Sequence, residues 1–249
     1  MSAVLIAGGT GHVGKPTVNA LRAAGHEVRV LSRKTGPGLT TGDLLTGDGI
    51  AQALDGADVV VHVATGGGSG KKDIGMAQTL FDACRAAGVG HVVLISIVGA
   101  DLIPFGYYNQ RVEIERRLVA SDLPYTIQRA TQFHSFVDGI FSAQRFMPVL
   151  LAPAMSVQPI DVVEVGRRLS ELASGPASGR VPDIGGPQRL TGRELARAWA
   201  SATGSRRRIV GLRLPGKTFA AFAAGHNMVP GPSFGHNTFA SYLVSTYHR

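Results

Sequence analysis

Three glycines, each three residues after the last, directly follow an apolar segment near the start of the sequence. Residues Ala3–Ala7 form that segment, and Gly8, Gly11 and Gly14 make a GxxGxxG pattern behind it. A continuous apolar run of this length is typical of a strand buried in a parallel sheet. Apolar residues then recur with helical spacing over residues 13–24. A strand, a glycine turn and a helix in this order restrict the fold to a small set of α/β arrangements.

Each glycine has its own task in such a turn. Gly8 permits a tight turn with a positive φ angle, Gly11 lets a pyrophosphate approach the backbone, and Gly14 lets the helix pack closely against the strand. The start of the helix then offers free N–H groups and a positive dipole end to phosphate oxygens. A glycine-rich connector without a ligand is the alternative, against which the flanking strand and helix argue. The expected dinucleotide contacts in this turn are Gly8, Thr10, Gly11, His12, Val13 and Gly14.

The end of the second expected strand, residues 27–31, distinguishes between two dinucleotides. Proteins that bind NAD place an Asp or Glu there, which accepts a hydrogen bond from the ribose 2′-hydroxyl. This sequence instead reads Ser32, Arg33 and Lys34, with two cations and no carboxylate. The Arg33 guanidinium can contact a 2′-phosphate through two N–H groups. The sequence therefore predicts NADP(H) as the cofactor, with these three residues as contacts; ordinary surface charges are the alternative.

Two further pairs of residues follow later strands and are expected at the same cofactor. Asp43 and Leu44 come after a weak strand over residues 39–42, where they would flank the adenine. Ala64 and Thr65 stand at the end of a strong strand over residues 58–64, near the pyrophosphate and ribose. Asp43 follows a glycine, so an ordinary turn is the alternative there.

Strands and helices alternate through the first half of the sequence, which predicts βαβ units and a parallel sheet with helices on both faces. The fold class is therefore α/β, a Rossmann-type doubly wound parallel sheet with a small irregular C-terminal part that binds substrate. We expect one NAD(P)-binding domain over residues 1–249, with the Rossmann core in 1–132 and a mixed remainder in 133–249. The other elements expected in the core are helices over Ile50–Leu54, 73–87 and 107–120, and strands over His91–Ile97 and 125–129.

The second half is less regular. Asp161 and Thr191 each precede an acidic residue by three positions, which is the pattern of a helix N-terminus. The later helix is expected to continue over residues 196–202, followed by a strand over Arg208–Leu212 and a terminal helix over 242–247.

Composition narrows the class of protein. Of the 249 residues, 25 are Lys or Arg and 17 are Asp or Glu, and the net charge of +8 suits a polyanionic ligand. Cys84 is the sole cysteine, so an internal disulfide is excluded, and no apolar run reaches the length of a membrane helix. We expect a cytoplasmic protein without a membrane or nucleic-acid partner. The arginines at 206–208 lack interleaved aromatic residues, and the scattered histidines predict no metal site.

The candidate catalytic residues lie at the end of the fifth expected strand and at the start of the helix after it. Ser96 is expected to donate a hydrogen bond to a substrate carbonyl oxygen. Tyr107 and Arg111 are four residues apart and share a helix face, so a nearby cation would lower the Tyr107 pKa and suit it as a general acid. Tyr108, the next residue along the helix, is the second candidate for this role. The alternative is aromatic packing at a helix start, with Ser96 as an ordinary strand end.

Several segments together resemble the atypical short-chain dehydrogenase/reductase superfamily, and its NmrA-like branch most nearly. The likeness is good over residues 1–175 and implies a Rossmann-type sheet, an NADP(H) site at the glycine turn and a substrate pocket under the C-terminal part. It rests on the glycine turn, the Gly42-Asp43-Leu44 turn, the strand at 59–64, the LISIVG block at 94–99, Tyr107-Tyr108 and the LPYTIQRAT stretch at 123–131.

One departure from that superfamily affects the expected reaction. Its catalytic pattern is Tyr-x-x-x-Lys, whereas this chain has Tyr107 followed by Arg111. Arginine holds its proton and cannot relay it as lysine does. The resemblance implies an NADP(H)-dependent oxidoreductase that reduces a small carbonyl or quinone-like substrate. Phe133 and His134 follow the sixth strand and are expected in the wall of the substrate pocket, together with Tyr108. Core aromatic residues with a hydrogen-bonded histidine are the alternative for the first two. A non-catalytic NADP(H)-sensing regulatory protein is the alternative.

Overall fold

A computed structural model describes residues 1–66 and 70–248. The chain divides into two compact units, and each is built from three separate segments of the sequence. The first unit comprises Met1–Ser96, Gly106–Arg129 and Val162–Pro182. The second comprises Ile97–Phe105, Ala130–Asp161 and the chain from Asp183 on. The expectation of one domain, divided near residue 132, stays a prediction.

The first unit is built on a seven-stranded sheet in the order β3-β2-β1-β4-β5-β6-β9. The pairs β2–β3, β1–β2, β1–β4, β4–β5 and β6–β9 all run parallel. This is the doubly wound arrangement, with the strand order reversing beside β1, and it confirms the predicted fold class. The strands are β1 (Ala3–Ala7), β2 (Glu27–Ser32), β3 (Leu39–Thr41), β4 (Val59–His62), β5 (His91–Ile97), β6 (Tyr125–Ala130) and β9 (Gly179–Arg180).

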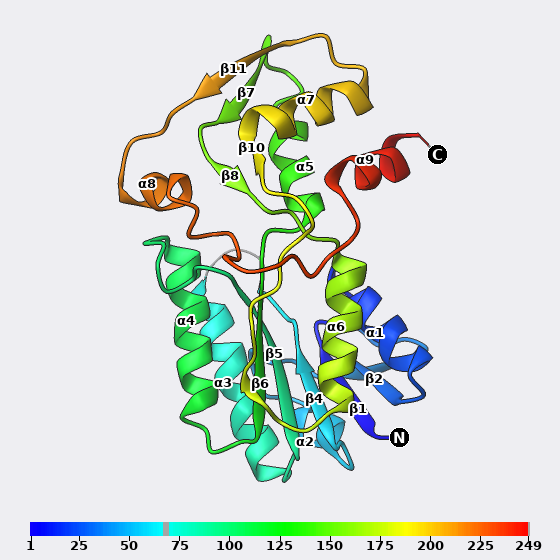
Figure 1. Cartoon of the computed structure of the whole chain (residues 1–249). Coiled ribbons are helices and arrows are strands. Elements are labelled where there is room, and N and C mark those ends of the chain that lie inside the picture. The colour runs from blue at the N-terminus through cyan, green and yellow to red at the C-terminus, as the bar shows by residue number, and fades with distance from the viewer. Residues whose placement is uncertain (67–69, 249) are drawn as a thin grey trace. The chain divides into compact units, whose positions relative to one another are not determined.

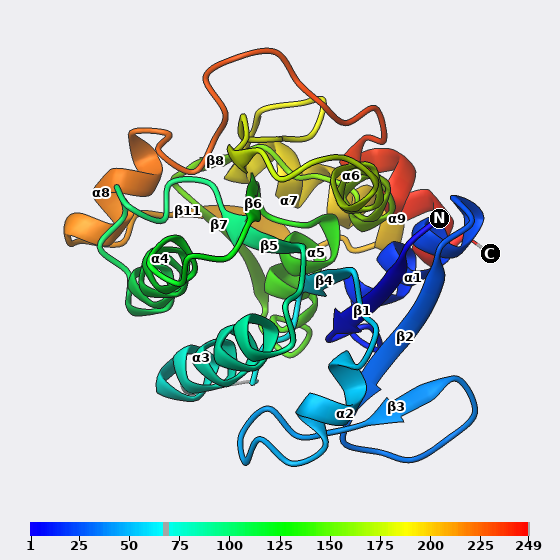
Figure 2. The same ribbon diagram turned by 90° about the horizontal axis from the view of Figure 1, so that it is seen from below.

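Helices cover both faces of this sheet, as Figures 1 and 2 show. On one face lie α2 (Ile50–Leu54), α3 (Gly70–Ala86) and α4 (Gly106–Val119). Their buried apolar residues, including Phe81 and Ile114, form one core with Val60 and Leu94 of the strands. On the other face lie α1 (Gly14–Ala23) and α6 (Val162–Ser174), which pack against each other. A Cβ atom on Gly166 of α6 would lie 2.8 Å from Thr17 N, so glycine permits this close approach.

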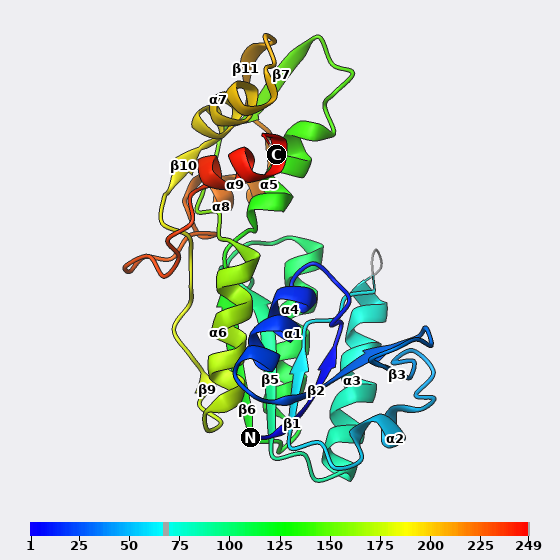
Figure 3. The same ribbon diagram turned by 90° about the vertical axis from the view of Figure 1, so that its right-hand side faces the viewer.

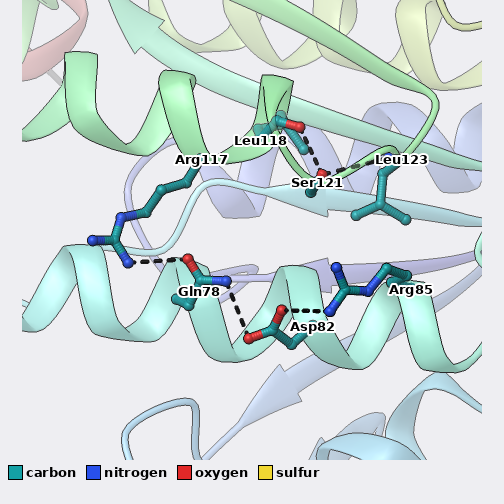
Figure 4. Close-up of polar contacts among 7 residues, drawn as sticks. All are labelled: Gln78, Asp82, Arg85, Arg117, Leu118, Ser121 and Leu123. Carbon is teal, nitrogen blue, oxygen red and sulfur yellow. Dashed lines mark hydrogen bonds and ion pairs between the residues drawn. The ribbon is translucent and has the colours of Figure 1, made fainter.

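Polar side chains connect α3 and α4 along their exposed rim (Figure 4). Arg117 Nη1 of α4 donates to Gln78 Oε1 of α3 at 3.0 Å, and Gln78 in turn donates to Asp82 at 3.1 Å. At the end of α4, Ser121 Oγ donates to the Leu118 carbonyl at 2.6 Å, which satisfies an acceptor that the helix leaves open. The Arg117–Gln78 contact thus links α4 to α3.

The second unit has two small sheets and its own core. β7 (Val149–Pro153) pairs in parallel with β11 (Arg208–Leu212), and β8 (Ser156–Val157) pairs antiparallel with β10 (Leu190–Thr191). Its helices are α5 (His134–Ser142), α7 (Gly192–Thr203), α8 (Lys217–Ala223) and α9 (Phe239–Tyr247). Figure 3 shows α9 beside α5 and α7, where Phe141, Trp199 and Phe239 belong to one buried cluster.

Most expected elements are present with ends that differ by a few residues. The capping pattern at Thr191 is confirmed, because its hydroxyl accepts from the Glu194 N–H and the Glu194 carboxylate accepts from the Thr191 N–H. The expected terminal helix begins three residues earlier, at Phe239. The sequence does not predict α5, β7, β8, β9, β10 or α8. None of the helices in the described residues has the length and apolarity of a membrane span.

Candidate functional site

The glycine turn leaves no room for side chains at two of its positions. Gly8 has a φ of +90°, and a Cβ there would lie 2.6 Å from the Ala64 Cα. A Cβ on Gly14 would overlap the Gly8 carbonyl oxygen. The Gly11 N–H donates to that same oxygen at 2.9 Å, which closes the turn. The backbone itself therefore requires glycine at positions 8 and 14, as expected of a strand–turn–helix that admits a dinucleotide.

The first turn of α1 carries no negative charge. It has no acidic residue, and among the described residues no side chain caps it. Thr10, Gly11 and His12 are exposed just before it, and Val13 is half-buried. An exposed cation, Lys15, lies in this turn, where the helix dipole disfavours positive charge. An anion bound at this helix end would remove that conflict, and the residues present therefore fit a pyrophosphate.

A pocket of about 520 Å³ opens beside this helix end in the first unit. Lys15, Pro16 and Asn19 of α1 line it together with Val162 and Val163 of α6. Thr10, Gly11 and His12 complete the lining. Three of the residues that the sequence predicts as cofactor contacts thus share one pocket with a cation.

The predicted 2′-phosphate contacts stand where β2 ends. Ser32 is its last residue, and Arg33 and Lys34 are exposed beyond it. Ser32 Oγ accepts from the Lys34 N–H at 3.0 Å, which shapes the turn. Both cations are without an ion-pair partner in the part of the chain that the structure describes. Their charges are therefore available to an anionic ligand.

The remaining predicted cofactor residues take up different positions. Asp43 Oδ1 accepts from the Leu45 N–H at 2.8 Å, so this carboxylate already organises its own turn. Leu44 is buried in the core of the first unit. Ala64 lies against Gly8, and Thr65 is exposed beyond the end of β4. Ala64 thus adjoins the turn directly, whereas the contact of Leu44 with a ligand stays a prediction.

The predicted catalytic residues differ sharply in exposure. The Ser96 side chain is 4% exposed near the end of β5, and its hydroxyl has no hydrogen-bond partner within the described residues. Arg111 is also 4% exposed, and its Nη1 has no partner there either. Tyr107, in the first turn of α4, is 38% exposed, and its ring centroid lies 5.7 Å from Arg111 Cζ. Tyr108 is buried. Tyr107 and Arg111 are thus brought together, with the buried guanidinium over the more exposed ring.

His62 is a further buried polar residue of the first unit, and in the sequence it stands only as one of several scattered histidines. It is the last residue of β4 and 1% exposed, and neither ring nitrogen has a partner in the described chain. Burial, with a smaller contribution from the Arg111 charge, lowers the His62 pKa to about 3. Its ring meets Phe81 edge to face at 6.0 Å. His62 lies two residues after Val60 and therefore on the same face of β4, the face whose residues pack with Phe81.

Of the predicted pocket residues in the second unit, His134 packs among the buried aromatic side chains. Phe133 precedes α5 and is half-buried. His134 is buried, its Nε2 lies 3.1 Å from the Pro159 carbonyl oxygen, and its ring packs against Phe239 and Tyr242. Burial lowers the His134 pKa. A role of either residue in binding substrate stays a prediction.

Comparison with known proteins identifies the family. Residues 8–139 match the model of the NAD(P)H-binding family. The chain belongs to this family. Pinoresinol reductase 1 of Arabidopsis thaliana is 27% identical over 179 residues, which cover 62% of this chain and 56% of that relative. Sterol demethylase protein B of Methylococcus capsulatus is 32% identical over 198 residues, covering 72% of this chain and 59% of the relative. The chain spans little more than half the length of these two relatives.

Solved structures share the fold over almost the whole chain. The NADPH complex of the NADPH-dependent quinone oxidoreductase QOR2 from Escherichia coli has a TM-score of 0.82 at 16% identity, with 98% of this chain and 99% of that chain covered. A nucleoside-diphosphate-sugar epimerase from Staphylococcus aureus has a TM-score of 0.81 at 20% identity, with 97% and 99% covered. The family match confirms the expected NAD(P)H-binding family, and these neighbours confirm the Rossmann-type fold that the resemblance implies.

Proposed function

We propose that this NAD(P)H-binding chain is an NADP(H)-dependent reductase of a small carbonyl or quinone-like substrate. The observation that carries the NADP(H) preference is the end of β2, where Arg33 and Lys34 are exposed cations without an ion-pair partner in the described chain. A 2′-phosphate is the group that distinguishes NADP from NAD, and a guanidinium is suited to it. The reductases among the relatives support the reaction class.

The proposed division of tasks follows the positions of the side chains. The glycine turn and Lys15 hold the pyrophosphate, and the cofactor when bound supplies the hydride. Ser96 donates a hydrogen bond to the acceptor's carbonyl oxygen, since its hydroxyl is buried without a partner in the described residues. Tyr107 anchors the acceptor or donates a proton, and Arg111 supplies positive charge beside it.

A binding comparison tests the cofactor preference. We expect Arg33→Ala to weaken NADPH binding tenfold or more, because a hydrogen bond to a charged group contributes about 1.5–3 kcal/mol. Binding of NADH should change by less than about twofold, since NADH lacks the 2′-phosphate. Isothermal titration calorimetry with both nucleotides measures the ratio. Arg116→Ala, which removes an exposed cation from α4, is the matched control. An unchanged NADPH-to-NADH ratio in Arg33→Ala rejects the preference.

A sensing protein without turnover is the second candidate, favoured by one observation. Arg111 stands where the superfamily places a proton-relaying lysine, and it is buried. Consumption of NADPH with a panel of quinones and aldehydes separates the two functions. Turnover on any acceptor, lost in Ser96→Ala, supports the reductase. Silence across the panel in a protein that binds NADPH tightly supports the sensor.

A further inference from the structure

The loop between α5 and β7, in the second unit, exposes two neighbouring apolar side chains. Phe146 is 85% exposed, and among the large apolar residues of the described chain only the terminal Met1 exceeds it. Met147, the next residue, is 37% exposed. Figure 3 shows this loop, in green, reaching beyond the end of α5. Scattered exposed apolar residues are ordinary in proteins, so the surroundings of these two decide whether they have a task.

The backbone of this loop is anchored on both sides of Phe146. Arg207 Nη1 donates to the Gln144 carbonyl oxygen at 2.5 Å and to the Met147 carbonyl oxygen at 3.4 Å. The same guanidinium lies over the Trp199 ring, with its Cζ atom 5.5 Å from the ring centroid. The exposure of Phe146 is therefore a consequence of how the loop is held, because the anchored backbone directs this side chain away from the core.

Three exposed arginines surround the loop. The Arg145 Cζ atom lies 4.6 Å from the centroid of the Phe146 ring. Arg208 is the partner of Val149 in the parallel pairing of β7 with β11, so their Cα atoms are about 5 Å apart. Arg206 stands two residues before Arg208 in the sequence. None of the three arginines forms an ion pair within the described chain.

The outer face of the two-stranded sheet of β7 and β11 continues this surface. Ile209 of β11 lies on the inner face, where it packs against the buried cluster that contains Trp199. Side chains alternate between the two faces of a strand, so Arg208 and Val210 point to the outer face. Both of these residues are exposed. The positive charge of Arg208 therefore lies beside apolar surface, as that of Arg145 does.

The sequence around this surface contains no negative charge. Asp and Glu are absent from residues 139–160 and from residues 195–249, which supply the loop and both strands. The charge therefore favours an anionic partner. An anionic bilayer accepts a projecting aromatic ring among its acyl chains without a preformed pocket, while arginines at the base of the ring meet the phosphates. A protein partner would have to supply a pocket for the ring.

We propose that residues 145–148, which we term the docking loop, bind the second unit to the surface of an anionic phospholipid bilayer. Phe146 inserts its ring at the boundary of the acyl chains, and Arg145, Arg206 and Arg208 contact lipid phosphates. The inference goes beyond the proposed reductase function and does not depend on it.

This contact differs from the membrane partner that the sequence analysis excludes. That expectation rests on the lack of an apolar run long enough to cross a bilayer, and no helix of the described residues could cross one. Binding at the surface depends instead on exposed apolar area and on attraction between cations and anionic lipids. One aromatic ring with three arginines around it supplies both.

Flotation of the full chain with lipid vesicles tests the proposal. We expect the chain to bind vesicles made of equal parts of phosphatidylcholine and phosphatidylglycerol. Vesicles of phosphatidylcholine alone should bind about tenfold more weakly or less, because each arginine near an anionic surface contributes about fivefold to binding. Salt at about 1 M shortens the Debye length to about 3 Å and should weaken binding. No binding to the anionic vesicles, or equal binding to both kinds, overturns the proposal.

Variants assign the binding to the docking loop. Phe146→Ser should weaken binding to anionic vesicles about tenfold or more, because the burial of a phenyl ring is lost. Arg145→Gln and Arg208→Gln should each weaken it about fivefold. The matched controls are Val244→Ser, which removes an exposed apolar side chain from α9, and Arg116→Gln, which removes an exposed cation from α4. Both controls should bind as the wild type does.

The exposure of Phe146 keeps this test separate from folding. Phe146→Ser should unfold at the same urea concentration as the wild type, since the ring buries little surface in the chain. Phe146→Trp adds a reporter, whose fluorescence emission should shift to the blue with anionic vesicles because the indole leaves water. Full vesicle binding by Phe146→Ser, or an unshifted emission of Phe146→Trp on saturating vesicles, contradicts the assignment.

Two other partners would give different results. A dimer in sedimentation velocity without lipid, dissociated by Phe146→Ser, would identify the loop as an interface between two copies of the chain. Binding of duplex DNA with a steep salt dependence, unaffected by Phe146→Ser and without a preference for anionic vesicles, would identify a nucleic-acid surface. Either result overturns the bilayer proposal.

Discussion

The guanidinium of Arg129 holds the carboxylate of Glu115 through two hydrogen bonds, of 2.8 and 2.7 Å, and both side chains are buried. The pair ties β6 to α4. Removing one partner of a buried pair leaves the other charge uncompensated. We expect Glu115→Gln to lower the free energy of unfolding by about 3 kcal/mol, measured by urea denaturation.

A second pair on the same helix provides the control for that measurement. Glu113 and Arg117 lie 2.8 Å apart, with each side chain 38% exposed. Exposed pairs contribute little, so Glu113→Gln should cost less than about 1 kcal/mol. Equal losses in Glu113→Gln and Glu115→Gln would show that burial does not govern the contribution of these pairs.

Alanine at Gly8 should be far more harmful than alanine at Gly25. Both glycines have a positive φ, of +90° and +83°, so both substitutions carry a backbone cost of about 1–2 kcal/mol. At Gly25 a Cβ would meet nothing within 4 Å, whereas at Gly8 it would lie 2.6 Å from the Ala64 backbone. Overpacking adds about 1–3 kcal/mol to Gly8→Ala. Urea denaturation measures the difference, and calorimetry should show that Gly8→Ala alone loses NADPH binding.

Burial of His62 should make the protein less stable in mild acid. The His62 pKa is about 3 in the folded chain against an ordinary value of 6.5, so between these values the unfolded chain binds a proton that the folded chain does not. Stability therefore falls as the pH drops from 6.5 toward 3. Between pH 7 and pH 5 this residue accounts for a loss of about 2 kcal/mol.

Denaturation of wild type and His62→Gln at both pH values isolates that contribution. The loss between pH 7 and pH 5 should be about 2 kcal/mol smaller in the variant. His91 and His134 also have lowered pKa values from burial, and their effect has the same sign in both proteins. An identical loss in the two proteins would mean that His62 is not held neutral.

Asp138 should be the most sensitive polar residue of the second unit. Its carboxylate accepts from Trp199 Nε1 at 2.8 Å, from the Tyr247 hydroxyl at 2.7 Å and from the Tyr242 hydroxyl at 3.3 Å. Asp138→Ala leaves these donors without their acceptor, and we expect a loss of about 1–3 kcal/mol. Because Trp199 is the sole tryptophan, its fluorescence follows the unfolding of this region. Asp82→Ala, which breaks an exposed pair with Arg85, should change stability by less than about 1 kcal/mol.

The first unit could be predicted well because its signals are local. β-branched runs such as that of β4 indicate buried strands, and the glycines at 8 and 14 mark a turn that the backbone geometry requires. β9 could not be predicted, because Gly179–Arg180 is two residues long and is a strand through its pairing with Thr126 and Ile127. Strand pairing of this kind depends on distant partners rather than on periodicity.

Of the candidate site, only the cofactor-binding part could be predicted from the sequence, again because its signals are local. The glycine turn and Arg33 are recognisable from position, since each follows directly from a strand end. The burial of Arg111 was not, because a charged residue on a helix is ordinarily exposed. Its environment depends on His62, which lies far away in the sequence and reads there as one histidine among eight.

The pairing of β9 with β6 also has a consequence for biosynthesis. β6 ends at Ala130, but the strand that covers its outer edge begins at Gly179. A ribosome that has released β6 therefore carries a nascent chain with open backbone N–H and C=O groups along that edge, and unpaired edges of this kind recruit other strands. We expect fragments that end between these two positions to aggregate more than chains extended past Pro182, in which β9 pairs with Thr126 and Ile127 of that edge.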